Sequence, residues 1–502
     1  MKIVGVVSLA SLCLVIGAPA FAAAKHKPAR VAQAATAASP ATTGPLDALA
    51  PPADPEHPSM TLEEALGIAY ETNPDLAAAQ AQLRASDEQV AIANGAWRPT
   101  IGITGSYGVE KYFFPGIPVT GFGTISSVTD HPLQGAATIT QPLFRSGRTI
   151  AEISRAKALV GSGRAQLTAT EQTVLLSAAT AYVNVVRDNW IVNLRRHNVE
   201  VLRRQRDSVQ LEFKAGSLTR TDVAQSEARL AGATSDLTTA EGQLATSRAD
   251  FLRAIGRPAE TLESKPGRPK TPDTEDAVLN VALKRNPALV TARANERAAK
   301  YAVDDAWGAM GPTLSVEGQY LYSQSALNSV QGFGAGGSPG SVTNHGVAII
   351  GQLNVPIYQA GIEEATIRQA RELHAQSQLN VSSSDRQVRD AVSTTWAAFQ
   401  STLGSIDSNQ TTVKADEIAF EGVSKEQRVG GRTVLDVLNA EQELLNAQVS
   451  LVTSQRDAIV AAYSVLAAGG MLTAKSLGLK VKLYDPLDHY NDDAAAWFGF
   501  GG

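Results

Sequence analysis

The chain has 502 residues, of which 44% are hydrophobic, 19% charged and only 6% aromatic. Its 44 Lys and Arg residues against 49 Asp and Glu give a net charge of −5, and no dense basic block argues for nucleic acid as a partner. A single cysteine, Cys13, excludes a disulfide framework and a cysteine-ligated metal centre. With so few aromatic rings to fill a thick core, we expect long, thin, Ala-rich helical packing.

The N-terminus has the pattern of a secretory signal peptide. Met1-Lys2 provides a positive end, Ile3 to Ile16 is an apolar stretch too short to span a bilayer comfortably, and Ala20-Phe21-Ala22 is an A-x-A cleavage pattern. The next segment, residues 23–58, is rich in Ala, Pro and Thr and has no periodicity, which predicts a disordered leader. We therefore expect an exported bacterial-type protein.

A twofold internal repeat is the strongest signal in the chain. Asn73-Pro74-Asp75-Leu76 matches Asn286-Pro287-Ala288-Leu289 at an offset of 213, and Pro142-Leu143-Phe144 matches Pro356-Ile357-Tyr358 at an offset of 214. Two long units that agree with one inserted residue indicate a duplicated fold. The predicted organisation is a signal peptide (1–22), a leader (23–58), a first repeat (59–262), a Pro-rich linker (263–273), a second repeat (274–477) and a C-terminal tail (478–502).

Each unit is expected to open with helix and continue with two strands. Apolar residues alternate with small or polar ones from Ile101 to Val109 and from Leu133 to Ile139, and again from Leu314 to Tyr322 and from Val347 to Val355. This period of two is typical of a transmembrane strand with one face in lipid, although a half-buried soluble hairpin has the same period. The connections, Pro115 to Asp130 and Gln324 to Asn344, are predicted to be long outer loops.

The rest of each unit predicts long helices. No proline occurs in residues 143–257 or 357–485, and Gly216 and Gly430-Gly431 interrupt these runs near their middles. Each run is therefore predicted to be a helical hairpin, and the stretch from Gly147 to Ala215 alone would give roughly 100 Å of helix. Such rods need other helices beside them, in a bundle or a tube.

The strand count predicts an oligomer. Four strands cannot close a membrane barrel, because the smallest have about eight and an open edge in lipid leaves backbone groups unpaired. Two copies would supply eight strands and three would supply twelve. The strand pattern alone leaves both numbers open.

The order of motifs resembles the TolC family of outer-membrane efflux proteins. Asn-Pro-x-Leu opens each unit, Pro-Leu-Phe-Arg-Ser-Gly and Pro-Ile-Tyr-Gln-Ala-Gly follow the second strands, and Gly-x-x-Thr-x-x-Asp-Val stands at each hairpin tip. The resemblance runs from about Thr61 to Leu477. It implies a mainly helical, TolC-like homotrimer, in which a twelve-stranded β-barrel in outer-membrane lipid continues into a periplasmic α-barrel. It also implies two partners, a periplasmic adaptor (membrane fusion) protein and an inner-membrane transporter.

The resemblance implies a gate at the helical tips. Asp436 matches an acidic constriction position, and Asp222 and Arg432 match positions that hold neighbouring helices together. Asn439 stands where a second aspartate would be and Gln427 replaces a tyrosine, so we expect one acidic ring and a looser latch. The residues expected to contact the adaptor are Gly216, Ser217, Leu218, Thr219, Gly430, Gly431 and Thr433. Without the family, each charged residue would be interpreted as a solvated helix-end charge.

No catalytic motif is present in the sequence. It contains neither a G-x-x-x-x-G-K-[ST] phosphate loop nor a Gly-x-Ser-x-Gly elbow, and its seven histidines form no H-x-x-x-H pair. We therefore expect no enzymatic activity, no metal and no cofactor. Two functions remain, an exit duct for efflux or type I secretion and a periplasmic coiled-coil or adhesin-type scaffold without a pore.

Overall fold

The computed structural model describes residues 59–119, 123–325 and 342–493. The predicted signal peptide and leader lie outside the described residues. The first repeat contains α1 (Leu62–Thr72), α2 (Pro74–Gly95), β1 (Thr100–Tyr107), β2 (Glu110–Val119), β3 (Gly123–Asp130), β4 (Leu133–Arg145), α3 (Arg148–Lys214) and α4 (Arg220–Ile255). The second contains α5 (Glu275–Arg285), α6 (Pro287–Ala309), β5 (Thr313–Ser325), β6 (Val342–Asn354), α8 (Ile362–Arg428) and α9 (Val434–Ala468), and α10 (Ala474–Leu477) and α11 (Asp488–Asp493) follow.

The Asn-Pro motif starts the second helix of each repeat. The Asn73 side chain accepts a hydrogen bond from the amide of Asp75 at 2.9 Å, and Asn286 accepts one from Ala288 at 3.0 Å. Proline follows at the first helical position, where its missing N–H costs nothing. The duplicated motif therefore encodes the same capped helix start twice, and the predicted tandem repeat is confirmed.

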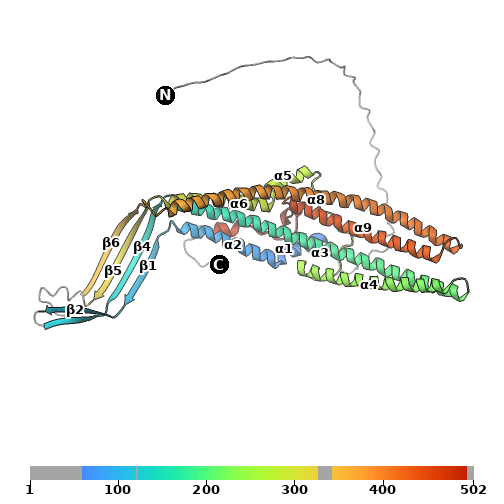
Figure 1. Cartoon of the computed structure of the whole chain (residues 1–502), viewed down its shortest axis with the longest axis horizontal. Coiled ribbons are helices and arrows are strands. Elements are labelled where there is room, and N and C mark those ends of the chain that lie inside the picture. Colours follow the sequence, from blue (N-terminus) through green and yellow to red (C-terminus); the bar gives the residue numbers. More distant parts are fainter. Residues whose placement is uncertain (1–58, 120–122, 326–341, 494–502) are drawn as a thin grey trace, which may run out of the picture. The chain divides into compact units, whose positions relative to one another are not determined.

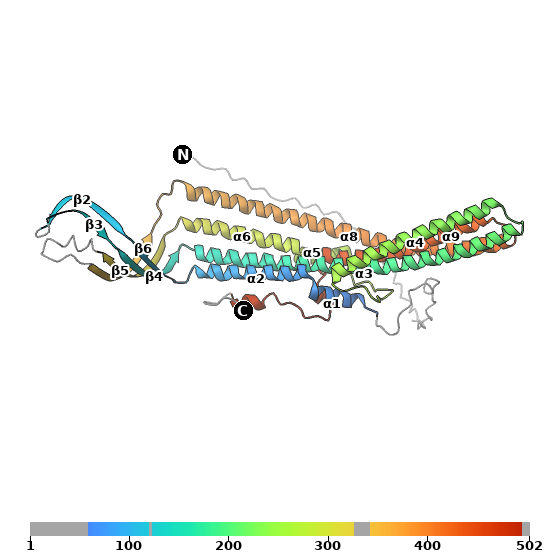
Figure 2. The same ribbon diagram turned by 90° about the horizontal axis from the view of Figure 1, so that it is seen from below.

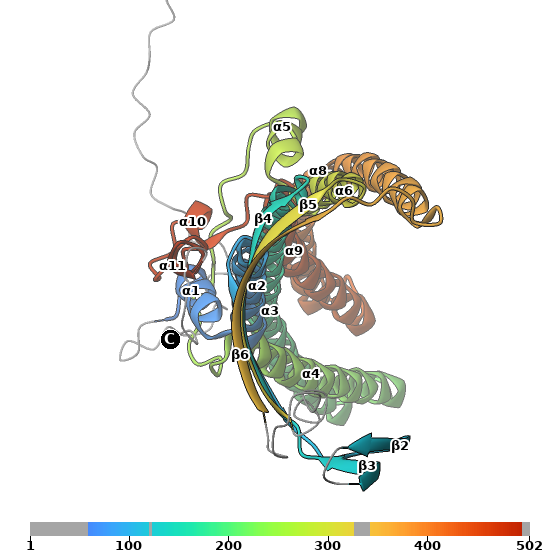
Figure 3. The ribbon, with the colours of Figure 1, turned by 90° about the vertical axis from the view of Figure 1, so that its left-hand side faces the viewer.

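Strands β1, β4, β5 and β6 form one antiparallel sheet in that order (Figure 1), and Figure 3 shows β4, β5 and β6 from a second side. Residues opposite each other in an antiparallel pair lie on the same face. Ile101 is opposite Ile139, Ile139 is opposite Gly318, and Gly318 is opposite Ile349. The apolar face defined by this register carries Ile101, Ile103, Gly105, Tyr107, Leu133, Gly135, Ala137, Ile139, Phe144, Leu314, Val316, Gly318, Tyr320, Tyr322, His345, Val347, Ile349, Gly351 and Leu353, and the polar residues Gln141, Gln324 and Thr343 also lie on it. The predicted alternation is confirmed on all four strands.

The other side of the sheet, its polar face, carries small and polar side chains. It consists of Thr100, Gly102, Thr104, Ser106, Gln134, Ala136, Thr138, Thr140, Pro142, Arg145, Thr313, Ser315, Glu317, Gln319, Leu321, Ser323, Ser325, Val342, Asn344, Gly346, Ala348, Ile350, Gln352 and Asn354. Leu321, Val342 and Ile350 are the larger apolar residues on it. On the apolar face, by contrast, Ile103, Val347 and Ile349 are 83%, 78% and 80% exposed in the single chain. So much apolar surface needs a nonaqueous neighbour.

The prediction of a loop from Pro115 to Asp130 is wrong. These residues belong largely to β2 and β3, which pair with each other in a separate two-stranded sheet. Pro115 and Gly116 are accommodated where the register shifts between Phe113 and Ile117, and Gly116 has a φ of +87°. Proline is tolerated in a two-stranded sheet because each strand has an edge that donates no hydrogen bond. In the predicted loop from Gln324 to Asn344, residues 326–341 lie outside the described residues.

Two long helical hairpins make up most of the chain. Helices α3 and α8 have 67 residues each, and therefore rise about 100 Å. Helix α4 packs along α3 and α9 packs along α8, while α3 also contacts α6 and α9 (Figures 1 and 2). None of the described helices combines the length and the apolar character needed to cross a membrane.

The C-terminal tail packs on the first repeat, which the sequence did not reveal. The amide of Tyr484 donates to the Tyr70 hydroxyl at 3.2 Å, and α11 lies on α2. There, the Arg164 guanidinium lies 5.0 Å from the centre of the Tyr490 ring, and His489 faces the buried carboxylate of Asp87 at 3.6 Å.

The two repeats are in close contact between the turn from β4 to α3 and the turn from α6 to β5. Arg148 donates to Asp305 at 3.0 Å, and the Ser146 hydroxyl donates to the Pro312 carbonyl at 2.5 Å. Gly308 lies against this junction, because a Cβ there would stand 2.8 Å from the Ser146 carbonyl oxygen and 2.6 Å from Arg148 Cγ. The contact fixes the second repeat's first strand beside the first repeat's third helix.

We predict that Gly308→Ala lowers the free energy of unfolding by about 1–3 kcal/mol, because the added methyl group overpacks the junction. The measurement is the thermal unfolding midpoint of the purified protein. The control is Gly232→Ala, where no atom lies within 4 Å of the added Cβ. A helical Gly→Ala change in open space should be neutral or stabilising, so equal midpoints for the two variants would contradict the prediction.

Candidate functional site

The tips of the two helical hairpins have the same backbone structure. Gly216 ends α3 with a φ of +83°, and the amide of Ser217 donates to the Glu212 carbonyl at 3.0 Å. Gly430 ends α8 with a φ of +80°, and the amide of Gly431 donates to the Glu426 carbonyl at 2.9 Å. Left-handed residues of this kind close a helix and reverse the chain. The predicted tips are therefore where the chain turns.

The two tip aspartates cap the returning helices. The amide and hydroxyl of Thr219 donate to Asp222 Oδ2 at 2.9 and 2.7 Å, and those of Thr433 donate to Asp436 Oδ2 at 2.9 and 2.8 Å. Each threonine hydroxyl in turn accepts from the aspartate amide, which completes a capping box. These hydrogen bonds from Thr219 and Thr433 lower the pKa of both exposed carboxyls, so both are ionised at neutral pH.

The remaining predicted gate residues have partners that the sequence did not reveal. Arg432 donates to Glu426 Oε2 at 2.9 Å, across the turn between α8 and α9. Asn439 on α9 accepts from Arg229 on α4 at 2.9 Å. Gln427 contributes its backbone carbonyl, which accepts from the Gly430 amide at 2.9 Å. The bond expected between neighbouring helices through Asp222 and Arg432 stays a prediction for the assembled protein.

A small apolar cluster behind the tips joins three helices. It contains Val199, Leu202 and Val209 of α3, Ala233 of α4, and Val434 and Leu438 of α9. Leu218, which was expected to contact an adaptor, packs partly against this cluster. The tip residues exposed in the single chain are Gly216, Ser217, Thr219, Gly430, Gly431, Arg432 and Thr433. The cluster therefore brings the first tip and the start of α9 together, while these tip residues stay exposed to solvent.

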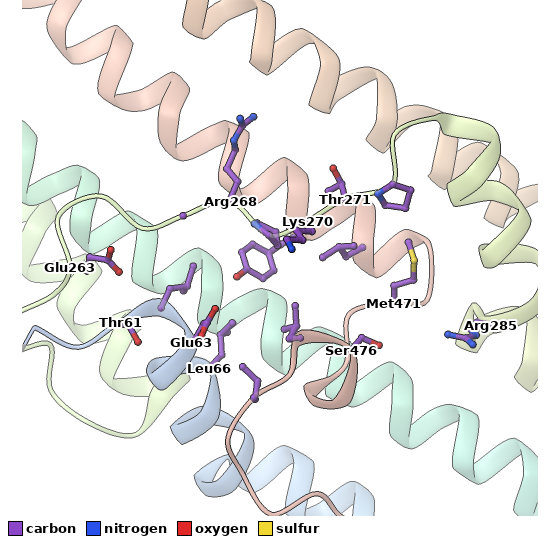
Figure 4. Close-up of a pocket in the computed structure, with 18 residues that line it drawn as sticks. Thr61, Glu63, Leu66, Glu263, Arg268, Lys270, Thr271, Arg285, Met471 and Ser476 are labelled. Atoms are coloured by element: carbon purple, nitrogen blue, oxygen red, sulfur yellow. The ribbon is translucent and has the colours of Figure 1, made fainter. Parts of the chain in front are cut away.

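A cavity of about 910 Å³ lies at the other end of α9 (Figure 4). The start of α1, the linker between the repeats, the end of α9 and the segment after it form its wall. Its charged residues are Glu63, Glu263, Arg268, Lys270 and Arg285. Arg268 points away from the labelled residues of α1 and Arg285 lies at the far side, so the cations do not converge (Figure 4). Across the described residues, no three His, Cys, Asp or Glu side chains are placed to hold a metal ion.

The comparisons with known proteins agree with this architecture. The family model described as "Outer membrane efflux protein" matches residues 65–257 and 278–470, one match for each repeat. The chain belongs to the outer membrane efflux protein family. It is 32% identical to the outer membrane efflux protein BepC of Brucella suis biovar 1 (strain 1330) over 441 residues, 88% of this chain and 92% of BepC.

Two further relatives extend the comparison to the TolC fold. The chain is 23% identical to the outer membrane protein TolC of Escherichia coli (strain K12) over 410 residues, 81% of each chain. The solved structure of the outer membrane protein VceC from Vibrio cholerae superposes with a TM-score of 0.68 at 19% identity, covering 82% of this chain and 96% of VceC. The expected TolC-like fold and the resemblance to this family are confirmed. The protein is an outer-membrane exit duct for efflux or secretion.

One buried carboxyl near the tips breaks the symmetry between the repeats. Glu441 on α9 is only 8% exposed, and its burial raises the pKa to about 7. The equivalent residue of the first repeat, Glu227, is exposed and accepts a hydrogen bond from Gln210 at 3.2 Å. Glu441 belongs to a helix that packs against α8 and α3.

We predict that Glu441→Gln stabilises the protein at pH 8 by roughly 3 kcal/mol. A raised folded-state pKa means that the folded protein binds the proton more tightly than the unfolded chain. Glu441 therefore costs stability as the pH rises from about 4.5 to about 7. The advantage of the glutamine should fall below roughly 1 kcal/mol near pH 5.

The measurement is the unfolding midpoint of both proteins in denaturant between pH 5 and pH 8. Glu227→Gln is the matched control, since it makes the same change at the exposed equivalent position. A stability difference for Glu441→Gln that does not vary with pH would contradict the raised pKa.

Proposed function

We propose that three copies of this chain assemble into one continuous duct through the outer membrane and the periplasm. The observation that carries the proposal is the sheet, in which an apolar face crosses all four strands and β1 and β6 stand at the two edges. In lipid, unpaired edge groups are too costly, so β6 of one chain must pair with β1 of the next. Three chains give twelve strands, which leave an open lumen.

The uneven burial of the long helices supports the same assembly. Helix α8 buries only Ile367, Val388, Val392, Phe399 and Val413 along its 67 residues. It leaves Leu373, Leu379 and Ile418 52%, 70% and 73% exposed. Helix α3, of equal length, has buried residues along most of it. We therefore expect α8 to lie against a neighbouring chain, where burial of these residues stabilises a tube of helices.

The exposed tips suit contact with other proteins of the export machine. The resemblance to the TolC family implies a periplasmic adaptor protein at Gly216, Thr219, Gly430 and Thr433, and an inner-membrane transporter that supplies the energy. The chain has no phosphate-loop motif with which to supply that energy itself. We propose no catalytic role for any of its residues.

The tip charges suit a gate in such a duct. In a trimer, three ionised Asp436 carboxylates would surround the periplasmic mouth, where they attract cations. Arg432, held by Glu426 within its own chain, stands four residues away and is exposed. We propose that Arg432 restrains the closed mouth and that Asp436 selects the ions that pass it.

We predict that Asp436→Asn reduces cation selectivity and block by divalent cations, and that Arg432→Ser raises the fraction of time spent open. The measurement is single-channel conductance in a planar bilayer with asymmetric KCl. The control is Arg428→Ser, which removes an exposed positive charge one turn before the tip. If neither Asp436→Asn nor Arg432→Ser differs from the wild type, these residues are not part of the gate.

The wild-type recording also decides between a duct and a scaffold. A cation-selective step from purified, folded protein supports the duct. No conductance at any protein concentration, from material shown to be folded and inserted in the bilayer, would favour a structural protein without a pore.

A further inference from the structure

Among the described residues, the polar face of the sheet carries one carboxylate, that of Glu317, and no described Lys or Arg forms an ion pair with it. Strands β1, β4, β5 and β6 contain two Asp, Glu, Lys or Arg residues, Arg145 and Glu317. Arg145 ends β4 and donates to Glu152 at 3.1 Å and to Thr149 at 3.1 Å. Glu317 is opposite Thr140 on one side and Ile350 on the other, and its neighbours along β5 on this face are Ser315 and Gln319.

The position of Glu317 in the sheet fixes which side of the membrane barrel it would face. Because the other face is apolar on all four strands, that face suits lipid and the polar face suits water. Glu317 is the fifth residue of β5, so it lies about 13 Å from the strand's helical end. In the proposed trimer, three copies of Glu317 would point into the water-filled lumen at one level.

The dimensions of a twelve-stranded barrel bring these charges close to the axis. Strands spaced about 4.8 Å apart and tilted by about 40° place the backbone about 12 Å from the axis. A glutamate side chain reaches roughly 5 Å inward, which leaves the carboxylates roughly 7 Å from the axis. Three charges at that distance in water enrich cations on the axis about elevenfold at 0.01 M salt, about 4.5-fold at 0.1 M and only about 1.3-fold at 1 M.

The tip aspartates are too far away to substitute for this ring. Helix α8 alone separates the strands from the second tip by about 100 Å. Screening reduces the interaction between charges to nothing over such a distance, even at about 0.01 M salt. Changes at the two levels should therefore act independently.

We propose that Glu317 forms a second cation-selecting ring inside the strand region, separate from the tip gate. The inference rests on the proposed trimeric duct. The ring would favour inorganic and organic cations over anions once the tip is open. It would also give the duct a selective element within the membrane barrel, in addition to the one at the periplasmic tips.

The test is the reversal potential of single channels in KCl gradients, recorded at low and at high mean salt. The contribution of Asp436 at the narrow tip is removed first with Asp436→Asn, and the effect of Glu317 is then measured as the change from that background. We expect Asp436→Asn channels to remain cation selective at about 0.01–0.1 M salt. Adding Glu317→Gln should lower the ratio of cation to anion permeability at least twofold at low salt and leave it unchanged at 1 M.

A relocated carboxylate provides the matched control. Gln319 lies two residues along β5 on the same face, so Gln319→Glu in the Glu317→Gln background returns one negative charge per chain to the lumen. This variant should recover the lost selectivity. The change Thr138→Gln on β4, which adds no charge to the polar face, should leave it unaltered.

The outcomes distinguish failure of the proposed Glu317 ring from failure of the proposed duct. If the channels conduct but Glu317→Gln leaves low-salt selectivity unchanged in the Asp436→Asn background, Glu317 is not a selecting residue and the duct stands. If folded and inserted wild-type protein never conducts, the duct itself fails, and the ring fails with it.

Discussion

Backbone hydrogen bonding in lipid is the constraint on which the rest of the structure depends. The sheet of β1, β4, β5 and β6 has an apolar face that water cannot cover favourably, and it ends in two strands with unpaired backbone groups. A single chain cannot satisfy both requirements with four strands. The assembly, the lumen and the tube of helices that continues from it all follow from closing those edges with other copies of the chain.

The duplication supplies two similar units, and their differences carry function. Both tips use a left-handed glycine and a Thr–Asp capping box, so the two turns are built alike. Of the two tips, both of which the structure describes, only the second has an ion pair across the turn, between Arg432 and Glu426. Both repeats have a glutamate at the equivalent position, and only that of the second repeat, Glu441, is buried. In the strands, Glu317 of the second repeat has no charged counterpart, since Thr104 stands at the matching distance after Pro99 and Thr100. The two charges that we propose act on ions, Asp436 and Glu317, therefore both come from the second repeat.

Local sequence predicted the elements because their signals are local. Asn-Pro starts, proline-free helices, glycine turns and strands of period two each depend on neighbouring residues. The hairpin of β2 and β3 was missed because Pro115 and Gly116 suggested a loop, although a register shift accommodates them. The partner Arg229 was missed for another reason. Arg229 meets Asn439 from 210 residues away, and only the packing of α4 beside α9 brings them together. The packing of the tail on α2 was missed for the same reason. Tyr490 contacts Arg164, which lies 326 residues earlier in the sequence.

The most direct test of this account is a disulfide cross-link between the two edge strands of the sheet. The chain has one cysteine, in the predicted signal peptide, so one introduced at Thr104 in β1 and a second scanned along β6 would be the only pair in the mature protein. The account predicts that oxidation of the membrane-inserted protein yields a species of three covalently joined chains on a denaturing gel at some position of the scan. Monomers alone at every position, or a ladder that ends at two chains, would contradict closure of the sheet by three copies.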